Sequence, residues 1–203
     1  HFTENLPREA DLLIYSAAIP ATNPERVAAQ ELGVVELSYS EFLGALAKEK
    51  KTIAVSGTNG KSTTTAMIAK ILIEADYDPT VILGTKSPDL NNSNLRIGKS
   101  DWLVIEACEH MANMLHIIPN IAVITNIEED HLDFYRDLDH ITQTFQKWID
   151  QMGVCGKTIL NTTDKNSMTL NTTDPALFKV DDRTIDKGVQ SFDVAGVPVE
   201  LTI

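Results

Sequence analysis

Residues 57–63, Gly-Thr-Asn-Gly-Lys-Ser-Thr, have the types and the spacing of a loop that holds phosphate groups. Gly57 and Gly60 allow a sharp turn in which backbone N–H groups point at phosphate oxygens. Lys61 can reach the terminal phosphates of a nucleotide, and the Ser62 hydroxyl can bind magnesium. The pattern predicts that a nucleoside triphosphate is bound by Gly57, Thr58, Asn59, Gly60, Lys61, Ser62 and Thr63.

The segments on either side of this loop support the prediction. Residues 51–56 are apolar enough for a buried strand, and residues 62–74 repeat apolar side chains at helical spacing. The N-terminus of that helix adds partial positive charge beside the loop. The common form of the loop has a glycine where Val55 stands, so this loop is a contracted form. The alternative is a glycine-rich turn without a ligand, which is rare for Gly-Lys-Ser-Thr after a strand.

Two further polar groups follow apolar runs, where strands are expected to end. Glu106 closes one run, and the segment 125–133, Thr-Asn-Ile-Glu-Glu-Asp-His-Leu-Asp, follows another. The carboxyl ends of parallel strands meet at one edge of a sheet, so we expect both groups near the phosphate loop. The Ser62 hydroxyl, the Glu106 carboxylate and the His131 imidazole would together hold magnesium ions that bridge phosphates.

Each of these residues also has a purely structural alternative. Glu106 could be a surface carboxylate, but a charge that ends a buried run needs a partner. His131 could be a loop histidine with one hydrogen bond, although its Asp-His-Leu-Asp setting favours a functional role. Cys108 is expected to be a small core residue rather than a nucleophile, because no neighbouring His or Asn suggests an activated thiolate.

Strands alternate with helices along most of the chain, which predicts an α/β fold. We expect a mostly parallel sheet of the phosphate-loop type with helices on both faces. Strands are expected at 51–56, 80–83, 102–106, 121–126 and 157–161, helices at 62–74 and 138–151, and a polar loop at 85–99. Weaker strand patterns lie near 177–180, 189–194 and 197–203.

Residues 1–48 show a shorter unit of the same kind. A strand is expected at 11–16 and another at 34–37, with a helix between them that begins after Asn23 and ends before Gly33. A second helix is expected at 40–48, capped by Ser40. We interpret residues 1–48 as the C-terminal part of a Rossmann-like domain whose start is missing. The charged segment 48–51 marks the boundary to a second domain, residues 49–203.

Composition narrows the classes of function. The chain has 203 residues and a formal net charge of -12, which argues against nucleic acid as a partner. No apolar run approaches the roughly 20 residues that span a bilayer, so no membrane insertion is expected. The two cysteines form no disulfide framework, which indicates the cytoplasm.

Three segments together resemble the Mur ligase family, which builds the peptide stem of bacterial peptidoglycan. They are residues 57–65, residues 106–109 (Glu-Ala-Cys-Glu) and residues 125–133. The contracted phosphate loop is the family's own form. The similarity is greatest to members that add L-alanine to UDP-N-acetylmuramate, and residues 5–25 look like the end of their UDP-binding domain. The family has Asp where Cys108 stands, and its usual Ser-Asp-containing stretch differs from His-Met-Ala-Asn at 110–113.

The resemblance implies an ATP-dependent, amide-forming ligase that works through an acyl phosphate. Its cofactors would be ATP and Mg²⁺, and its substrates UDP-N-acetylmuramate and L-alanine. Lys61 would contact the ATP phosphates, Ser62 and Glu106 would bind one magnesium ion, and His131 would help to hold a second. Lys61, Glu106 and His131 would thus carry catalysis. The substrate would be contacted by His1 and Ser16 near the UDP diphosphate and by Asn94 near the muramyl sugar.

The resemblance also implies that the chain is a fragment. The central ATP-binding domain is expected to be incomplete and the C-terminal ligase domain absent, so we expect this piece to bind ATP weakly and not to ligate. Two alternatives stay open. One is a related ligase that adds a peptide or another amino acid, and the other is a non-catalytic nucleotide-binding module.

Overall fold

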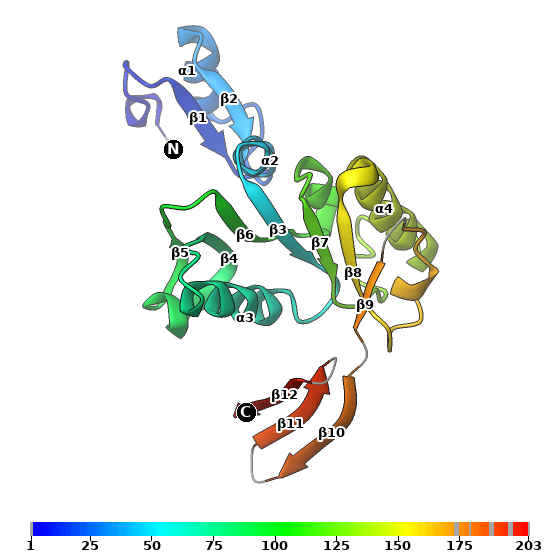
Figure 1. Ribbon diagram of the computed structural model, residues 1–203. Helices are drawn as coiled ribbons and strands as arrows, with labels where there is room; N and C mark the ends of the chain where they lie inside the picture. Colours follow the sequence, from blue (N-terminus) through cyan, green and yellow to red (C-terminus); the bar gives the residue numbers. More distant parts are fainter. Residues whose placement is uncertain (1, 173–174, 179, 187–188, 195–196, 203) are drawn as a thin grey trace.

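The computed structural model describes residues 2–172, 175–178, 180–186, 189–194 and 197–202 (Figure 1). A seven-stranded sheet with the order β5-β4-β6-β3-β7-β8-β9 forms the centre of the described chain. Its strands are β3 (Lys51–Ser56), β4 (Thr80–Ser87), β5 (Ser93–Arg96), β6 (Trp102–Glu106), β7 (Ile121–Ile124), β8 (Lys157–Asn161) and β9 (Pro175–Phe178). Every neighbouring pair is parallel except β4 and β5. The predicted α/β fold with a mostly parallel sheet is confirmed.

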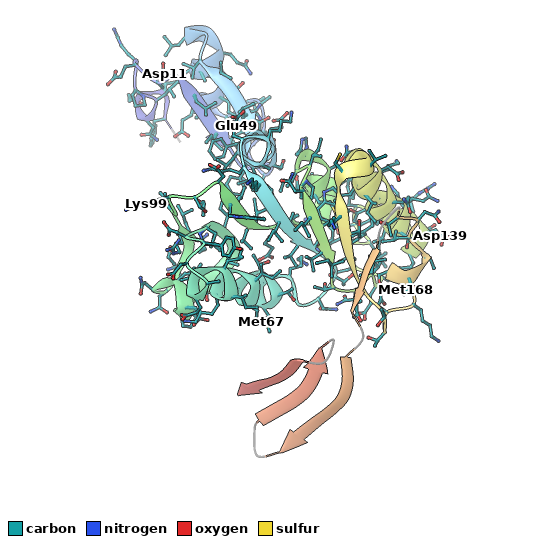
Figure 2. All side chains as sticks on the ribbon, in the orientation of Figure 1. Asp11, Glu49, Met67, Lys99, Asp139 and Met168 are labelled. Carbon is teal, nitrogen blue, oxygen red and sulfur yellow. The ribbon has the colours of Figure 1, made fainter. Side chains whose placement is uncertain are left out.

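Helices cover both faces of this sheet. Helix α3 (Lys61–Glu74) packs on the face formed by Val81, Leu83 and Val104, with Ala69 at the contact. The opposite face is covered by α4 (Leu138–Gln151) and α2 (Tyr39–Lys48). Side chains alternate between the faces along each strand, as the pleat requires. Figure 2 shows the packed side chains, with Met67 on the outer, exposed side of α3.

The segment expected as a polar loop at 85–99 is partly a strand, so that prediction was wrong. Strand β4 continues to Ser87, and β5 pairs with it antiparallel at the edge of the sheet. Arg96 fastens this edge, because its guanidinium donates to Asp78 Oδ1 at 2.6 Å and to the Pro79 carbonyl at 2.6 Å. Edge strands tolerate polar side chains, which is why the composition of 93–96 resembles that of a loop.

The first part of the chain forms a separate two-stranded parallel sheet of β1 (Leu12–Tyr15) and β2 (Val35–Ser38). Between them lies α1 (Pro24–Leu32), which is capped by Asn23 and ends at Gly33, as predicted. The predicted cap of α2 was wrong by two residues. Ser38 caps the helix, since its Oγ accepts from the Glu41 N–H at 3.2 Å while Glu41 Oε2 accepts from the Ser38 N–H at 2.7 Å. Ser40 lies inside the helix.

The end of the described chain forms a third, antiparallel sheet with the order β10-β11-β12 (Figure 1). Its strands are β10 (Val180–Asp186), β11 (Val189–Val194) and β12 (Val197–Thr202). The expected strands near 189–194 and 197–203 are confirmed. The pattern near 177–180 combined the end of β9 with the start of β10, whose charged residues hid its length.

Short 3-10 helices join these elements: η1 (Thr3–Asn5), η2 (Pro88–Leu90), η3 (His110–His116), η4 (Gly153–Cys155) and η5 (Ser167–Thr169). Segment η3 is irregular, because Met111 and Ala112 have left-handed backbone conformations with φ of 53° and 56°. Among the described residues, no helix is long and apolar enough to cross a membrane.

Candidate nucleotide-binding site

The phosphate loop joins β3 to α3, and both of its glycines have backbone angles that disfavour a side chain. Gly57 has a φ of +136°, and a Cβ there would lie 2.1 Å from Thr125 Oγ1. Gly60 has a φ of +82° and precedes the first residue of α3. The chain can therefore turn here only without side chains, and the turn directs the N-terminus of α3 toward the loop.

The end of β7 holds the loop in place. The Asn59 N–H donates to Asn126 Oδ1 at 2.9 Å, and Thr125 Oγ1 donates to the Asn59 carbonyl at 2.7 Å. The Glu128 N–H donates to Thr58 Oγ1 at 2.8 Å. The segment 125–133, expected at the same rim as the loop, thus binds the loop directly through its first residues.

Lys61 is bound by three acceptors. Its Nζ donates to the carbonyls of Gly57 at 2.7 Å and Thr58 at 3.0 Å, and to Glu109 Oε1 at 2.9 Å. The ammonium group therefore lies across the loop, where a phosphate chain would be held. Its bonds to the loop carbonyls and the carboxylate are those that an incoming phosphate would replace.

Ser62 and Glu106 meet as the sequence predicted. The Ser62 hydroxyl donates to Glu106 Oε2 at 2.8 Å, and the Gly84 N–H donates to the same oxygen at 2.9 Å. Glu106 ends β6, which lies next to β3 in the sheet. The parallel register therefore brings a hydroxyl and a carboxylate, two oxygen ligands suited to Mg²⁺, to one point beside the loop.

Glu109 is a buried carboxylate that the sequence analysis did not select. It is 2% exposed, and its Oε2 has no hydrogen-bond partner among the described residues. Besides Lys61 at 2.9 Å, Glu109 Oε1 has the His131 Nε2 at 3.5 Å. A buried charge needs compensation, and here the Lys61 ammonium group supplies it. The signal in the sequence was its place at the end of the Glu-Ala-Cys-Glu segment, three residues after Glu106.

His131 is joined to the loop through Glu109, and among the described contacts it bonds to neither Ser62 nor Glu106. Its backbone is left-handed, with a φ of 51°, and its N–H donates to Asp130 Oδ1 at 2.7 Å. Such a conformation is uncommon for a residue other than glycine. The structure thus sets the imidazole beside the buried carboxylate rather than beside the hydroxyl.

Two further residues lie next to Glu109: Tyr135 contacts its backbone, and Cys108 precedes it in the sequence. The Tyr135 hydroxyl donates to the Glu109 carbonyl, and burial together with the Glu109 charge raises the pKa of Tyr135 to about 12. Cys108 was expected in the core, but it is exposed. The alternation of β6 continues past Glu106, because the Ala107 N–H donates to the Val55 carbonyl, so Ala107 and Glu109 point inward and Cys108 outward. Partial desolvation raises the pKa of Cys108.

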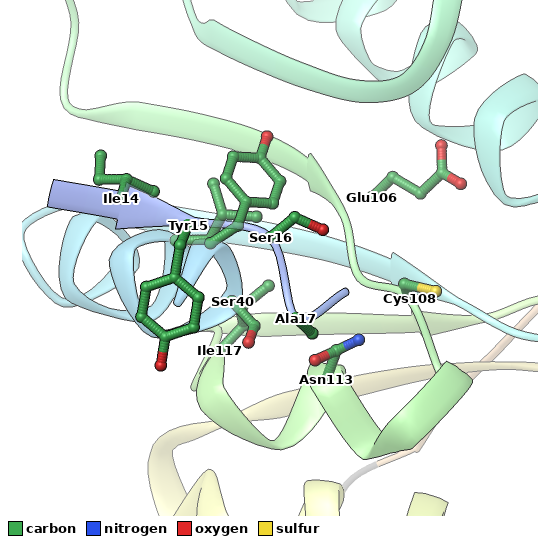
Figure 3. A pocket seen from close by; sticks show the side chains of 11 residues that line it. Ile14, Tyr15, Ser16, Ala17, Ser40, Glu106, Cys108, Asn113 and Ile117 are labelled. Carbon is green, nitrogen blue, oxygen red and sulfur yellow. The ribbon is translucent and has the colours of Figure 1, made fainter. Parts of the chain in front are cut away.

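A cavity of about 330 Å³ lies where the first part of the chain meets the central sheet (Figure 3). Ser16, which follows β1, and Glu106 from the central sheet both line it. The other lining residues are Ile14, Tyr15, Ala17, Tyr39, Ser40, Leu43, Cys108, Asn113 and Ile117. Glu106 therefore contacts the phosphate-loop serine and also borders a space large enough for a second substrate.

The other two predicted substrate residues do not join this group. Asn94 is exposed on the edge strand β5 and does not line the cavity. His1 lies outside the described residues. A second, more open cavity of about 390 Å³ adjoins the loop at Asn59 and Gly60 and extends to the ends of β7 and β8.

Sequence comparison finds matches to two domain profiles of the Mur ligase family. The profile described as Mur ligase middle domain matches residues 55–191. The profile described as Mur ligase family, catalytic domain, matches residues 2–51.

Individual relatives agree with these profiles. The UDP-N-acetylmuramate–L-alanine ligase of Clostridium novyi is 41% identical over 195 residues, which are 96% of this chain and 41% of that protein. The ligase of the same name from Clostridium perfringens is 40% identical over 169 residues, 83% of this chain and 36% of the relative. The chain thus spans less than half the length of the curated relatives it matches.

Solved structures show the same similarity. The UDP-N-acetylmuramate–alanine ligase of Thermotoga maritima superposes with a TM-score of 0.81 at 27% identity, covering 100% of this chain and 49% of that chain. The MurF ligase of Thermotoga maritima in complex with ADP has a TM-score of 0.66 at 17% identity, covering 97% of this chain and 56% of that chain. The second likeness shows the fold alone.

Proposed function

The chain belongs to the Mur ligase family, and on that premise we propose that the full-length protein is an ATP-dependent ligase that joins L-alanine to UDP-N-acetylmuramate in peptidoglycan synthesis. The names of relatives about 40% identical to this chain support the choice of substrates. Because the reaction consumes ATP and a nucleotide-linked sugar, the proposal includes the cytoplasm as its location.

One observation carries the proposal: Glu106 faces two sites at once. It accepts from Ser62 of the phosphate loop, and it lines the cavity that Ser16 borders from the other side. A ligase that activates a carboxylate must bring a terminal phosphate next to that carboxylate. A residue that contacts the nucleotide loop and also borders a separate cavity is placed to serve both.

The residues present fit magnesium. The Ser62 hydroxyl and the Glu106 carboxylate are oxygen ligands of the kind that Mg²⁺ prefers, and we assign them to one ion. We assign His131 to a second ion, supported by the neighbouring Glu109, whose buried Oε2 has no hydrogen-bond partner among the described residues. Bound magnesium would neutralise negative charge on the phosphates and on the transferring phosphoryl group.

The chain's own residues then position the reactants. On ATP binding, Lys61 would exchange the loop carbonyls and Glu109 for phosphate oxygens. A carboxylate oxygen of the substrate attacks the γ-phosphorus, the bond to ADP breaks, and an acyl phosphate forms. The amine of L-alanine then attacks the acyl carbon, phosphate leaves, and the amine loses a proton. Lys61 and the N-terminus of α3 stabilise the phosphoryl group during the first step.

We also retain the domain division at residues 48 and 49 as a proposal. The separate two-stranded sheet of β1 and β2 supports it, and so do the two profile matches at 2–51 and 55–191. The first domain would bind the UDP portion through Ser16, and the second would bind ATP.

The test is release of ADP by the full-length protein. We expect release that requires UDP-N-acetylmuramate and L-alanine together, with the joined product detected by mass spectrometry. Release that requires a peptide or another amino acid instead would identify a related ligase. ATP binding without turnover on any acceptor would identify a non-catalytic module and refute the proposal.

A further inference from the structure

Two histidines and an aspartate meet beside the site described above. His110 of η3 and His131 stack their rings with centroids 4.3 Å apart and planes inclined by 21°. His110 Nε2 lies 3.3 Å from Asp133 Oδ2. One ligand atom from each of His110, His131 and Asp133 lies within 4.8 Å of the other two. Neither His110 nor Asp133 has a part in the proposed magnesium sites.

We propose that His110, His131 and Asp133 form a binding site for a divalent transition-metal ion such as Zn²⁺. Two imidazoles and one carboxylate suit Zn²⁺, whereas Mg²⁺ prefers oxygen ligands and retains water. A tetrahedral ion about 2.0–2.1 Å from its ligands separates neighbouring ligand atoms by about 3.3 Å. His110 Nε2 and Asp133 Oδ2 already have that separation.

The surroundings of His131 add support from a different observation. Glu109 Oε1 lies 3.5 Å from His131 Nε2, and its other oxygen is buried without a partner among the described residues. Carboxylates that bond to a metal-binding histidine fix the orientation of its ring. Asp130, Glu109 and His131 also form a ligand cluster of their own, so His131 has further carboxylates within reach.

The backbone is strained in the segments that carry both imidazoles. Met111 and Ala112 directly follow His110, and they have left-handed backbones, as does His131 itself. None of the three is a glycine, so the surrounding structure must maintain these conformations. The two rings are stacked, so one imidazole must rotate about its Cβ–Cγ bond before both nitrogen atoms face one ion.

One consequence rests on the proposed function. His131 serves both the transition-metal site and the proposed second magnesium site, so one ion would exclude the other from this imidazole. We therefore expect Zn²⁺ to inhibit the ligase in competition with Mg²⁺.

The experiment uses Co²⁺ as a spectroscopic substitute for Zn²⁺ on the nucleotide-free, full-length protein. Cys108→Ser and Cys155→Ser form the background, because exposed thiols would otherwise bind Co²⁺. We expect titration with Co²⁺ to produce the intense visible absorption of a four- or five-coordinate ion, and Zn²⁺ to abolish it. A spectrum that stays that of hydrated Co²⁺ would overturn the proposal.

Single variants then assign the ligands. His110→Ser and, independently, Asp133→Asn should weaken Co²⁺ binding by about tenfold or more, because each removes a direct ligand. His116→Ser is the matched control, since His116 is exposed at the far end of η3 and should bind Co²⁺ like the parent. If both ligand variants bind Co²⁺ as tightly as the control while circular dichroism shows a native fold, the site does not exist.

An activity measurement separates this inference from the proposed function. At fixed Mg²⁺, Zn²⁺ should inhibit the parent ligase, and His110→Ser should resist inhibition while it keeps its basal rate. Equal inhibition of both proteins would refute the competition. If the protein binds Co²⁺ at this cluster but shows no ligase activity, the proposed function fails and the metal site stands.

Discussion

The phosphate loop (residues 57–63) and the facing rim, which we define as residues 109–112 and 128–133, hold their charged groups in opposite ways. In the loop, glycines take up the unusual backbone angles, and backbone and side-chain bonds to the end of β7 fix Thr58 and Asn59. In the facing rim, residues other than glycine adopt left-handed angles, and a buried carboxylate oxygen is left without a partner among the described residues. The comparison indicates that the loop is preformed, and it supports the proposal that the facing residues bind cations.

Removal of the lysine that joins the two regions should have the largest effect. Lys61→Ala should lower kcat/KM by about a hundred- to a thousandfold, the typical loss when one preorganised donor to the transition state is removed. The measurement is ADP release by the full-length protein. Lys70→Ala is the matched control, because Lys70 on the same helix is exposed and pairs only with Glu74 among the ion pairs of the described chain. A decrease in kcat/KM of less than tenfold would contradict a role of Lys61 in stabilising the transition state.

The preformed loop is tested next through Gly57→Ala. Its Cβ would lie 2.1 Å from Thr125 Oγ1 at a φ of +136°, so we expect a loss of about 1–3 kcal/mol in the free energy of unfolding, together with weaker ATP binding. Urea unfolding and nucleotide titration measure the two effects. Gly153→Ala is the comparison, because it also places a side chain at a positive φ, of +63°, but its Cβ would have no atom within 4 Å. Equal losses in the two variants would contradict a sterically required loop.

The cation-binding character of the rim is tested by Glu109→Gln. The amide keeps the size of the side chain but removes the charge that faces Lys61 and His131, so the Mg²⁺ concentration for half-maximal activity should rise about tenfold. Glu129→Gln, an exposed neighbour on the same rim, should leave that concentration unchanged. An unchanged Mg²⁺ requirement in Glu109→Gln would show that the carboxylate serves only Lys61.

The smallest effect is expected from loss of the hydrogen bond between the Tyr135 hydroxyl and the Glu109 carbonyl. Tyr135→Phe removes the hydrogen bond to the Glu109 carbonyl and should cost about 1 kcal/mol of stability at neutral pH. Folding raises the Tyr135 pKa from 10.0 to about 12, so its stabilising term is complete below pH 10 and declines as the pH rises toward 12. The stability difference between parent and variant should therefore shrink over that range. Tyr77→Phe, which removes the hydroxyl of an exposed tyrosine, is the control variant for this measurement.

The two regions also differ in how far their structure follows from sequence. The loop residues are contiguous and lie between a strand and a helix, so their local pattern was sufficient to predict the element and the meeting of Ser62 with Glu106. Glu109 was not predicted as a site residue, because its partners are distant in sequence: Lys61 lies 48 positions earlier and Tyr135 lies 26 positions later. Such partners are defined by the tertiary fold and not by local spacing.

The remaining errors have local causes. Cys108 was assigned to the core from its residue type, but the alternation that continues past β6 decides which side it faces. The Ser38-x-x-Glu41 pattern was available in the sequence and would have given the correct cap of α2. Strand β5 was hidden because an exposed edge strand has the composition of a loop.

The three bonds of the Lys61 ammonium group have a consequence for the choice of nucleotide. Because Gly57, Thr58 and Glu109 already occupy its donors, ATP must displace existing partners instead of filling an open position. A nucleotide whose phosphate chain is too short to reach Lys61 leaves those bonds intact and gains nothing from the lysine. The affinity of the loop for a nucleotide should therefore depend on the length of the phosphate chain. We expect the loop to bind a triphosphate more tightly than a monophosphate in the absence of the second substrate.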